Sequence, residues 1–109
     1  MQYTIYQLNT RTPRDERPYD YEFMRWDYAE KNGFNFKEHY EKVYNGTINK
    51  SGSDHVILDG YLWEKFNINH PSDFKGHSLS VSDIVQLNDK YYYCDSFGWK
   101  DITSVIKQS

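Results

Sequence analysis

The stretch from Asn67 to Thr103 constrains the fold more than any other part of the sequence. It holds three short runs of strand-forming residues, which we expect to form strands at Asp83–Leu87, at Tyr91–Asp95 and from Trp99 onward. The connections are short, because Asn88-Asp89 is a two-residue turn signal and a second turn spans Ser96 to Trp99. Strands joined by such turns pair as hairpins, so this stretch predicts an antiparallel sheet.

Two further strands and two helices precede this stretch. Gln2–Leu8 and Tyr40–Ile48 are rich in β-branched and aromatic residues, which predicts strands, with a turn or bulge at Asn45-Gly46. Both faces of the first strand carry apolar side chains, so an interior position in the sheet suits it at least as well as an edge. Helical spacing appears over Tyr19–Asn32 and Leu58–Asn67.

The order of these elements, β-α-β-α-β-β-β, predicts the fold class. We expect one α+β domain over residues 1–109, with a small, mostly antiparallel sheet of about five strands and two short helices on one face.

The expected helices carry end signals. Asp20 and Asp59 stand at preferred N-cap positions, and Gly33 stands where a C′ glycine ends a helix. Phe23 and Trp26 follow i, i+3 spacing, which fits a helix face packed on the core and also fits an anchor for a partner.

The composition limits the classes of partner and the location. A net charge of −3 over 109 residues does not favour binding of nucleic acid through its phosphates. No apolar run is long enough to cross a membrane, and the first residues lack the pattern of a secretory signal. A single cysteine, Cys94, excludes an internal disulfide and fits a reducing compartment. We therefore expect a cytoplasmic protein without direct contact to membrane or nucleic acid.

Catalytic and metal-binding patterns with specific spacing are absent from the sequence. The four histidines are scattered, at His39, His55, His70 and His77. The last two could meet across a turn with Asp73 between them, but this spacing is not specific for a metal. Cys94 has no neighbouring cation to activate its thiol, so we expect a small buried residue there. We expect no cofactor, no metal and no enzymatic activity.

The polar residues before the first C-terminal strand have a structural interpretation. Ser78, Ser80, Ser82 and Asp83 are expected to hydrogen-bond neighbouring backbone amides. The aromatic side chains of residues 91–99 are expected to fill a small core.

A family resemblance covers most of the chain. The segment FNINHPSDFKGHSLSVSDIVQL, followed by YYYCDSFGWKDI, resembles the YodL-like domain of Gram-positive conjugative elements, as do YTIYQL and YEKVYNGTI. The motif positions that we expect to make the fold are Phe66, His70, Pro71, Gly76, His77, Ser78, Asp83, Asp95, Phe97 and Gly98. The resemblance implies a protein of a mobile element and attaches no catalysis to these residues.

Size, charge and resemblance together predict a protein that binds and blocks a host protein. In its most specific form this is an anti-CRISPR protein that inhibits an RNA-guided DNA nuclease, because the basic grooves of such nucleases complement an acidic, aromatic surface. The alternative is a nucleic-acid-binding or cytoskeleton-interacting accessory module of a conjugative element. The candidate partner contacts are the charged residues Arg11, Arg14, Asp15 and Glu16, together with Trp26.

Overall fold

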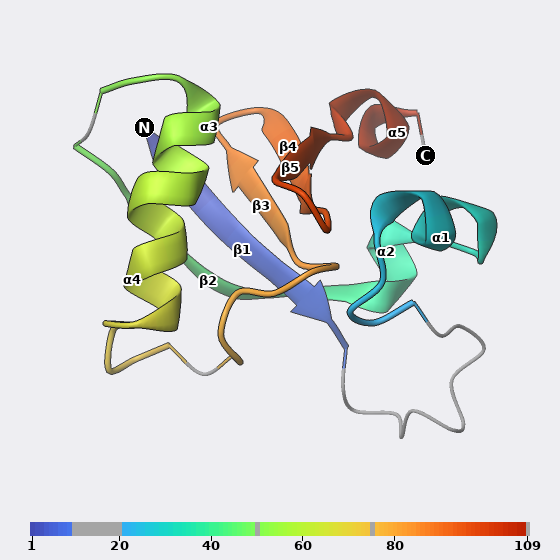
Figure 1. Ribbon diagram of the computed structural model, residues 1–109, viewed down its shortest axis with the longest axis horizontal. Helices are drawn as coiled ribbons and strands as arrows, with labels where there is room; N and C mark the ends of the chain where they lie inside the picture. Colours follow the sequence, from blue (N-terminus) through green and yellow to red (C-terminus); the bar gives the residue numbers. More distant parts are fainter. Residues whose placement is uncertain (10–20, 50, 75, 109) are drawn as a thin grey trace.

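The domain is organised around one sheet of five antiparallel strands (Figure 1). The computed structural model describes residues 1–9, 21–49, 51–74 and 76–108. The strands are β1 Gln2–Leu8, β2 Tyr40–Thr47, β3 Ile84–Leu87, β4 Lys90–Cys94 and β5 Trp99–Asp101, in the spatial order β2-β1-β3-β4-β5. The sequence left both an interior and an edge position open for the first strand, and β1 is interior, since it pairs with β2 on one side and with β3 on the other.

Helices lie between the strands and after them, which confirms the α+β class in roughly the expected order. They are α1 Trp26–Lys31, α2 Phe36–His39, the continuous run α3 Asp54–Val56, η2 Ile57–Leu62 and α4 Trp63–Asn67, and α5 Thr103–Lys107. The C-terminal helix α5 was not expected from the sequence. It packs back on the domain through the partly buried side chains of Val105 and Ile106.

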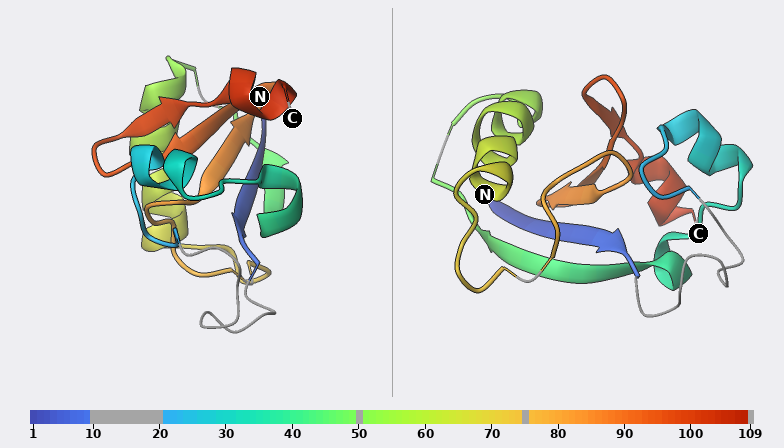
Figure 2. Two further views of the ribbon diagram at one scale, coloured as in Figure 1. Left: turned by 90° about the vertical axis from the view of Figure 1, so that its right-hand side faces the viewer. Right: turned by 60° about the horizontal axis from the view of Figure 1, so that its bottom comes forward.

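The helices cover both faces of the sheet, and the expectation of one covered face was wrong. On one face, Tyr3 and Ile5 of β1 join a buried cluster with Leu58 and Leu62 of the helix at 54–67. On the other face, a second cluster holds residues of β1, β3 and β4 with those of α1: Leu8, Ile84, Tyr93, Trp26 and Ala29. In Figure 2 the helix at 54–67 and α1 lie on opposite sides of β3 and β4. The cause is the alternation of apolar side chains along the interior strands, which leaves two apolar faces to bury.

The irregularity in β2 lies two residues before the expected place at Asn45-Gly46. Ile5 pairs with Tyr44 and Tyr6 pairs with Lys42, so Val43 is the extra residue of a bulge. Gly46 pairs regularly with Tyr3 instead of forming a turn.

The helix at 54–67 begins earlier than expected. Ser53 is its N-cap, with Oγ accepting from Val56 N, whereas Asp59 was the expected cap. The helix therefore starts at Asp54, four residues before the expected start at Leu58. Asp59 is left in the middle of the helix, where its side chain is available for other contacts.

The helix expected over Tyr19–Asn32 is shorter, because α1 begins only at Trp26. Phe23 has a φ of 66°, in the left-handed region, which is incompatible with a right-handed helix at that position. Gly33 follows the C-cap with a φ of 88°, as a C′ glycine does, so that end signal is confirmed. Asp20, the expected cap, lies outside the described residues.

Candidate functional site

The motif segment from Phe66 to Phe74 packs one end of the helix against the sheet. The Phe66 side chain is fully buried, and its ring meets the edge of Tyr3 at 5.9 Å and of Phe74 at 4.9 Å between centroids. A turn closed by a bond from Phe74 N to Pro71 O, 3.0 Å long, brings Phe74 back to this position. His70 is exposed on the outside of the turn. Phe66 and the turn at Pro71 therefore contribute contacts between the helix and the sheet.

Gln7 ties β1 to the motif segment 76–83. Its Nε2 donates to the carbonyl of His77 at 2.8 Å and to Asp83 Oδ2 at 3.1 Å, while its Oε1 accepts from His77 N at 3.2 Å. A Cβ at Gly76 would collide with Gln7 Oε1, so this close approach requires glycine. The sequence offered one signal for Gln7, which is a polar residue on the same face of the strand as the apolar Tyr3 and Ile5.

Asp83 is the most deeply buried carboxyl of this segment, with 1% of its surface exposed. Burial raises its pKa well above the ordinary value, and the hydrogen bonds from Ser80 N and Gln7 partly oppose that shift. The bond from Ser80 N to Asp83 Oδ2, 3.0 Å long, confirms the expected bonding to a neighbouring backbone amide. For Ser82 the expected bond to a neighbouring amide was wrong, because its Oγ accepts from the distant Phe23 N at 3.0 Å.

Serine, histidine and aspartate come together here, but their contacts differ from those of a hydrolytic triad. His77 Nδ1 lies 2.7 Å from the carbonyl oxygen of Ser78, which only accepts, so Nδ1 is the donor. His77 Nε2 faces Asp83 Oδ1 at 3.8 Å. Ser80 Oγ is buried and has no hydrogen-bond partner among the described residues, whereas a nucleophile is bonded to its base. These contacts join the segment to the sheet.

The turn between β4 and β5 exposes the Phe97 side chain to solvent. Asp95 N donates to the carbonyl of Gly98 at 2.9 Å, and Asp95 Oδ1 accepts from Ser96 N at 2.9 Å and from Trp26 N at 3.1 Å. Gly98 has a φ of 81°, which favours glycine. The Phe97 side chain at the tip is 96% exposed, so its expected place in the core was wrong. The turn projects beyond the sheet, and no described side chain lies outside it to cover the ring.

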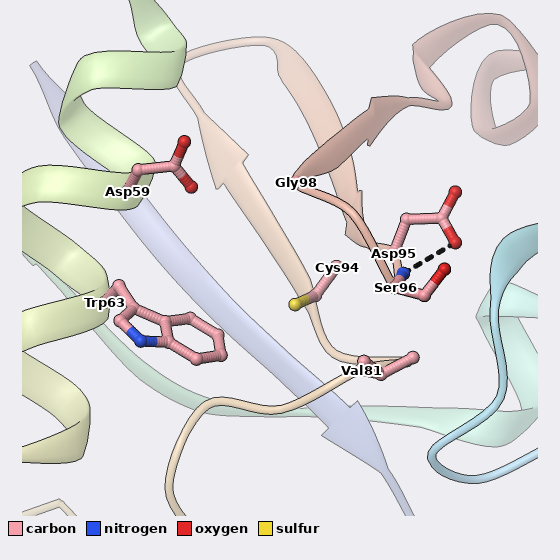
Figure 3. Close-up of a pocket in the computed structure, with 7 residues that line it drawn as sticks. All are labelled: Asp59, Trp63, Val81, Cys94, Asp95, Ser96 and Gly98. Atoms are coloured by element: carbon pink, nitrogen blue, oxygen red, sulfur yellow. Dashed lines mark hydrogen bonds between the residues drawn. The ribbon is translucent and has the colours of Figure 1, made fainter.

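A cavity of about 300 Å³ lies between this turn and the helix at 54–67 (Figure 3). Asp59 and Trp63 of the helix form one wall, the turn residues form the other, and Val81 and Cys94 also line it. Asp59 is held in place by Trp99, whose Nε1 donates to Asp59 Oδ1 at 2.9 Å. Cys94 is 4% exposed, so the expected buried residue is confirmed. Burial is the larger cause, and the nearby carboxylates the smaller cause, that raise the pKa of its thiol to about 12. The thiol is therefore uncharged at neutral pH.

The candidate partner contacts fall into two groups. Arg11, Arg14, Asp15 and Glu16 lie outside the described residues. Trp26 is 7% exposed, and its ring packs against Phe34 at 4.8 Å and Tyr93 at 5.0 Å, so its side chain belongs to the core. Phe23, which was expected on the same helix face, is 51% exposed.

The described part of the chain has neither a metal centre nor a membrane-spanning helix. No three His, Cys, Asp or Glu side chains in these residues are grouped so that they could hold a metal ion. None of the helices described is long and apolar enough to span a bilayer.

Comparison with known proteins gives one family. No curated protein and no solved structure matches the chain. The family model of the YodL-like domain matches residues 2–104, which span the whole sheet and the motif segments described above. The chain therefore belongs to the YodL-like domain family.

Proposed function

We propose that this domain is a non-catalytic binding protein that attaches to a host protein and blocks it. The observation that carries the proposal is Phe97, which is 96% exposed on a turn held by hydrogen bonds at Asp95. Burying a phenylalanine side chain is worth about 1.5–3 kcal/mol, and a ring kept outside the core gains that free energy only in a partner's pocket. Exposed aromatic side chains of this kind are common anchors of protein interfaces.

Two further aromatic side chains are exposed near the same end of β4. Trp63, 40% exposed, lines the cavity together with Ser96 and Gly98, the two neighbours of Phe97. Phe23, 51% exposed, is bonded through its backbone to Ser82, which in turn bonds the carbonyl of Cys94. We call Phe23, Trp63 and Phe97 the aromatic rim. Its rings are carried by three segments far apart in the sequence, the turn before α1, the helix α4 and the β4–β5 turn, which supports a surface shaped for contact.

The partner that we propose is an RNA-guided DNA nuclease of the host, and the chain would act as the product of a mobile element. Such nucleases hold their nucleic acids in positively charged channels. The chain has a net charge of −3, so its approach to such a channel is favoured by electrostatic complementarity. The aromatic rim would supply the contacts that last after the encounter.

A cleavage assay tests this proposal. The purified protein is added to nuclease, guide RNA and target DNA, and complex formation is followed by gel filtration. We expect wild-type protein to reduce cleavage and to elute with the nuclease. Unchanged cleavage with separate elution would rule out this partner, and retardation of DNA alone in a low-salt gel shift would point to nucleic-acid binding instead.

A matched pair of variants tests the role of the rim. We expect Phe97→Ser to weaken binding at least about tenfold, as loss of a central aromatic anchor does. Its melting temperature should stay that of wild type, because the ring makes no buried contact. Ile68→Ser is the control, since Ile68 is also exposed, at 71%, but follows the far end of α4. Equal weakening by both changes would contradict a specific role for Phe97.

A further inference from the structure

The cavity beside the β4–β5 turn combines an aromatic wall, an apolar lining and one carboxylate. Trp63, a residue that is 40% exposed, contributes its indole ring, and Val81 and Cys94 contribute apolar surface. In Figure 3 the Cys94 sulfur points toward the helix that carries Asp59 and Trp63. The volume of about 300 Å³ is at the lower end of the range for small-molecule pockets, roughly 300–1,000 Å³, and suits one long side chain.

The charge of the cavity is negative and uncompensated. Asp59 Oδ1 accepts from Trp99 Nε1 at 2.9 Å, which fixes the carboxylate, while Oδ2 makes no hydrogen bond to a described residue. Asp95 adds a second negative charge nearby, although its carboxylate turns away from the cavity and bonds Trp26 N. Among the described residues, neither lysine nor arginine lines the cavity.

We propose that this cavity receives an arginine side chain of the partner protein. The inference rests on the proposed binding function and deepens it by naming the side chain that the site accepts. The aliphatic stem of arginine covers apolar surface while its guanidinium donates to a carboxylate. The planar guanidinium also stacks on an indole ring, which a lysine ammonium does less well. Arginine is abundant where proteins bind nucleic acid, so a nuclease channel presents such side chains.

An NMR titration of the whole protein tests the site without the partner. The probe is N-acetyl-arginine N-methylamide, and the comparison compound is its citrulline analogue, which has nearly the same shape and no charge. We expect the arginine compound to shift the indole signals of Trp63 and Trp99 in a saturable way. The indole signal of Trp26 should stay in place, because that ring lies in the cluster on the opposite face. Equal shifts with citrulline, or none with arginine, would overturn the inference.

A matched pair of substitutions identifies the carboxylate. Asp59→Asn removes the charge and keeps an amide oxygen for Trp99 Nε1, and we expect it to weaken binding of the arginine compound at least about tenfold. Asp89→Asn is the control, since Asp89 is an exposed carboxylate at the β3–β4 turn, the other end of β4. Thermal melting verifies that both variants fold. Binding by Asp59→Asn as tight as that of wild type would refute the role of this residue.

The two proposals fail in different ways. If wild-type protein and Asp59→Asn inhibit the nuclease equally, the arginine site is wrong and the binding function stands. If the arginine compound binds through Asp59 but the nuclease is neither bound nor inhibited, the site stands and the proposed partner is wrong.

Discussion

At the scale of single residues, Asp83 has the environment with the clearest thermodynamic consequence. Its ordinary pKa is 3.8, and burial raises this value in the folded protein. The folded state therefore keeps the Asp83 proton at pH values where the unfolded chain has released it. The stability that this provides is fully present below pH 3.8 and is lost as pH rises through the raised pKa. Glu22 adds to the shift, and a protonated His77 facing the carboxyl would oppose it.

We expect Asp83→Asn to reduce this pH dependence. The amide oxygen of asparagine can still accept a bond from Ser80 N or Gln7, and the side chain has no proton to lose. The melting temperature of the variant relative to wild type should therefore rise as pH increases above about 4. Melting curves for both proteins over a pH series provide the measurement. Parallel pH profiles would show that Asp83 does not titrate in this range.

The sequence predicted the roles of single residues best where a local pattern determined them. Asp83 and Gly33 act through turn and cap geometry, which short-range spacing encodes, whereas Ser82 bonds Phe23, 59 residues away in the chain. Phe97 was misassigned because an aromatic residue is expected inside, and only the three-dimensional path of the turn places it outside. The sequence places Asp59 at a helix cap, because no local pattern reveals its bond to Trp99, forty residues away.

At the scale of elements, two glycines differ in the space available for a side chain, one in a strand and one in a helix. Gly46 in β2 lies under the ring of Tyr3, and a Cβ there would come within 2.7 Å of the Tyr3 hydroxyl oxygen. Gly60 in η2 has open space around its Cα and no positive φ.

The same substitution at these two positions should therefore have opposite effects. We expect Gly60→Ala to stabilise the domain by about 0.5–1 kcal/mol, because alanine loses less backbone entropy in a helix. Gly46→Ala should destabilise it by about 1–3 kcal/mol through overpacking against Tyr3. Urea unfolding of both variants measures the two free energies. Two changes of the same sign would contradict this account.

The elements that the sequence predicted are those with local signals at both ends. The hairpin of β3 and β4 has its turn at Asn88, with a φ of 53°, where the two-residue signal stood. The sequence did not predict the helix start at Ser53 or the helix α5. In both segments the residues fit a polar loop as well as a helix, and packing against the rest of the domain decides for the helix. Ile102 is 1% exposed next to α5, and Thr103 Oγ1 accepts from Tyr91 N at 2.8 Å.

At the scale of the whole molecule, the N-terminal strand β1 lies inside the sheet, between the edge strand β2 and the middle strand β3. β1 pairs with β2 and with β3, whose residues follow it by about eighty positions in the chain. It also contributes side chains to the apolar clusters on both faces. Its amides are therefore exposed only when a large part of the domain unfolds.

Hydrogen exchange should show this order of stability. We expect the amides of β1, β3 and the part of β4 bonded to β3 to be the most protected, and the three-residue edge strand β5 to exchange first. Amide exchange followed by NMR or mass spectrometry gives the ranking. Exchange in β1 as fast as in β5 would contradict its interior position in the sheet.

The burial of Cys94 has a practical consequence for chemical labelling. The only thiol of the chain is 4% exposed and uncharged at neutral pH, so maleimide and iodoacetamide should leave the native protein unmodified. A cysteine introduced at an exposed position would then be the single reactive thiol in the molecule. A photo-crosslinker or fluorophore attached through Phe97→Cys would report directly on whatever the tip of the hairpin touches.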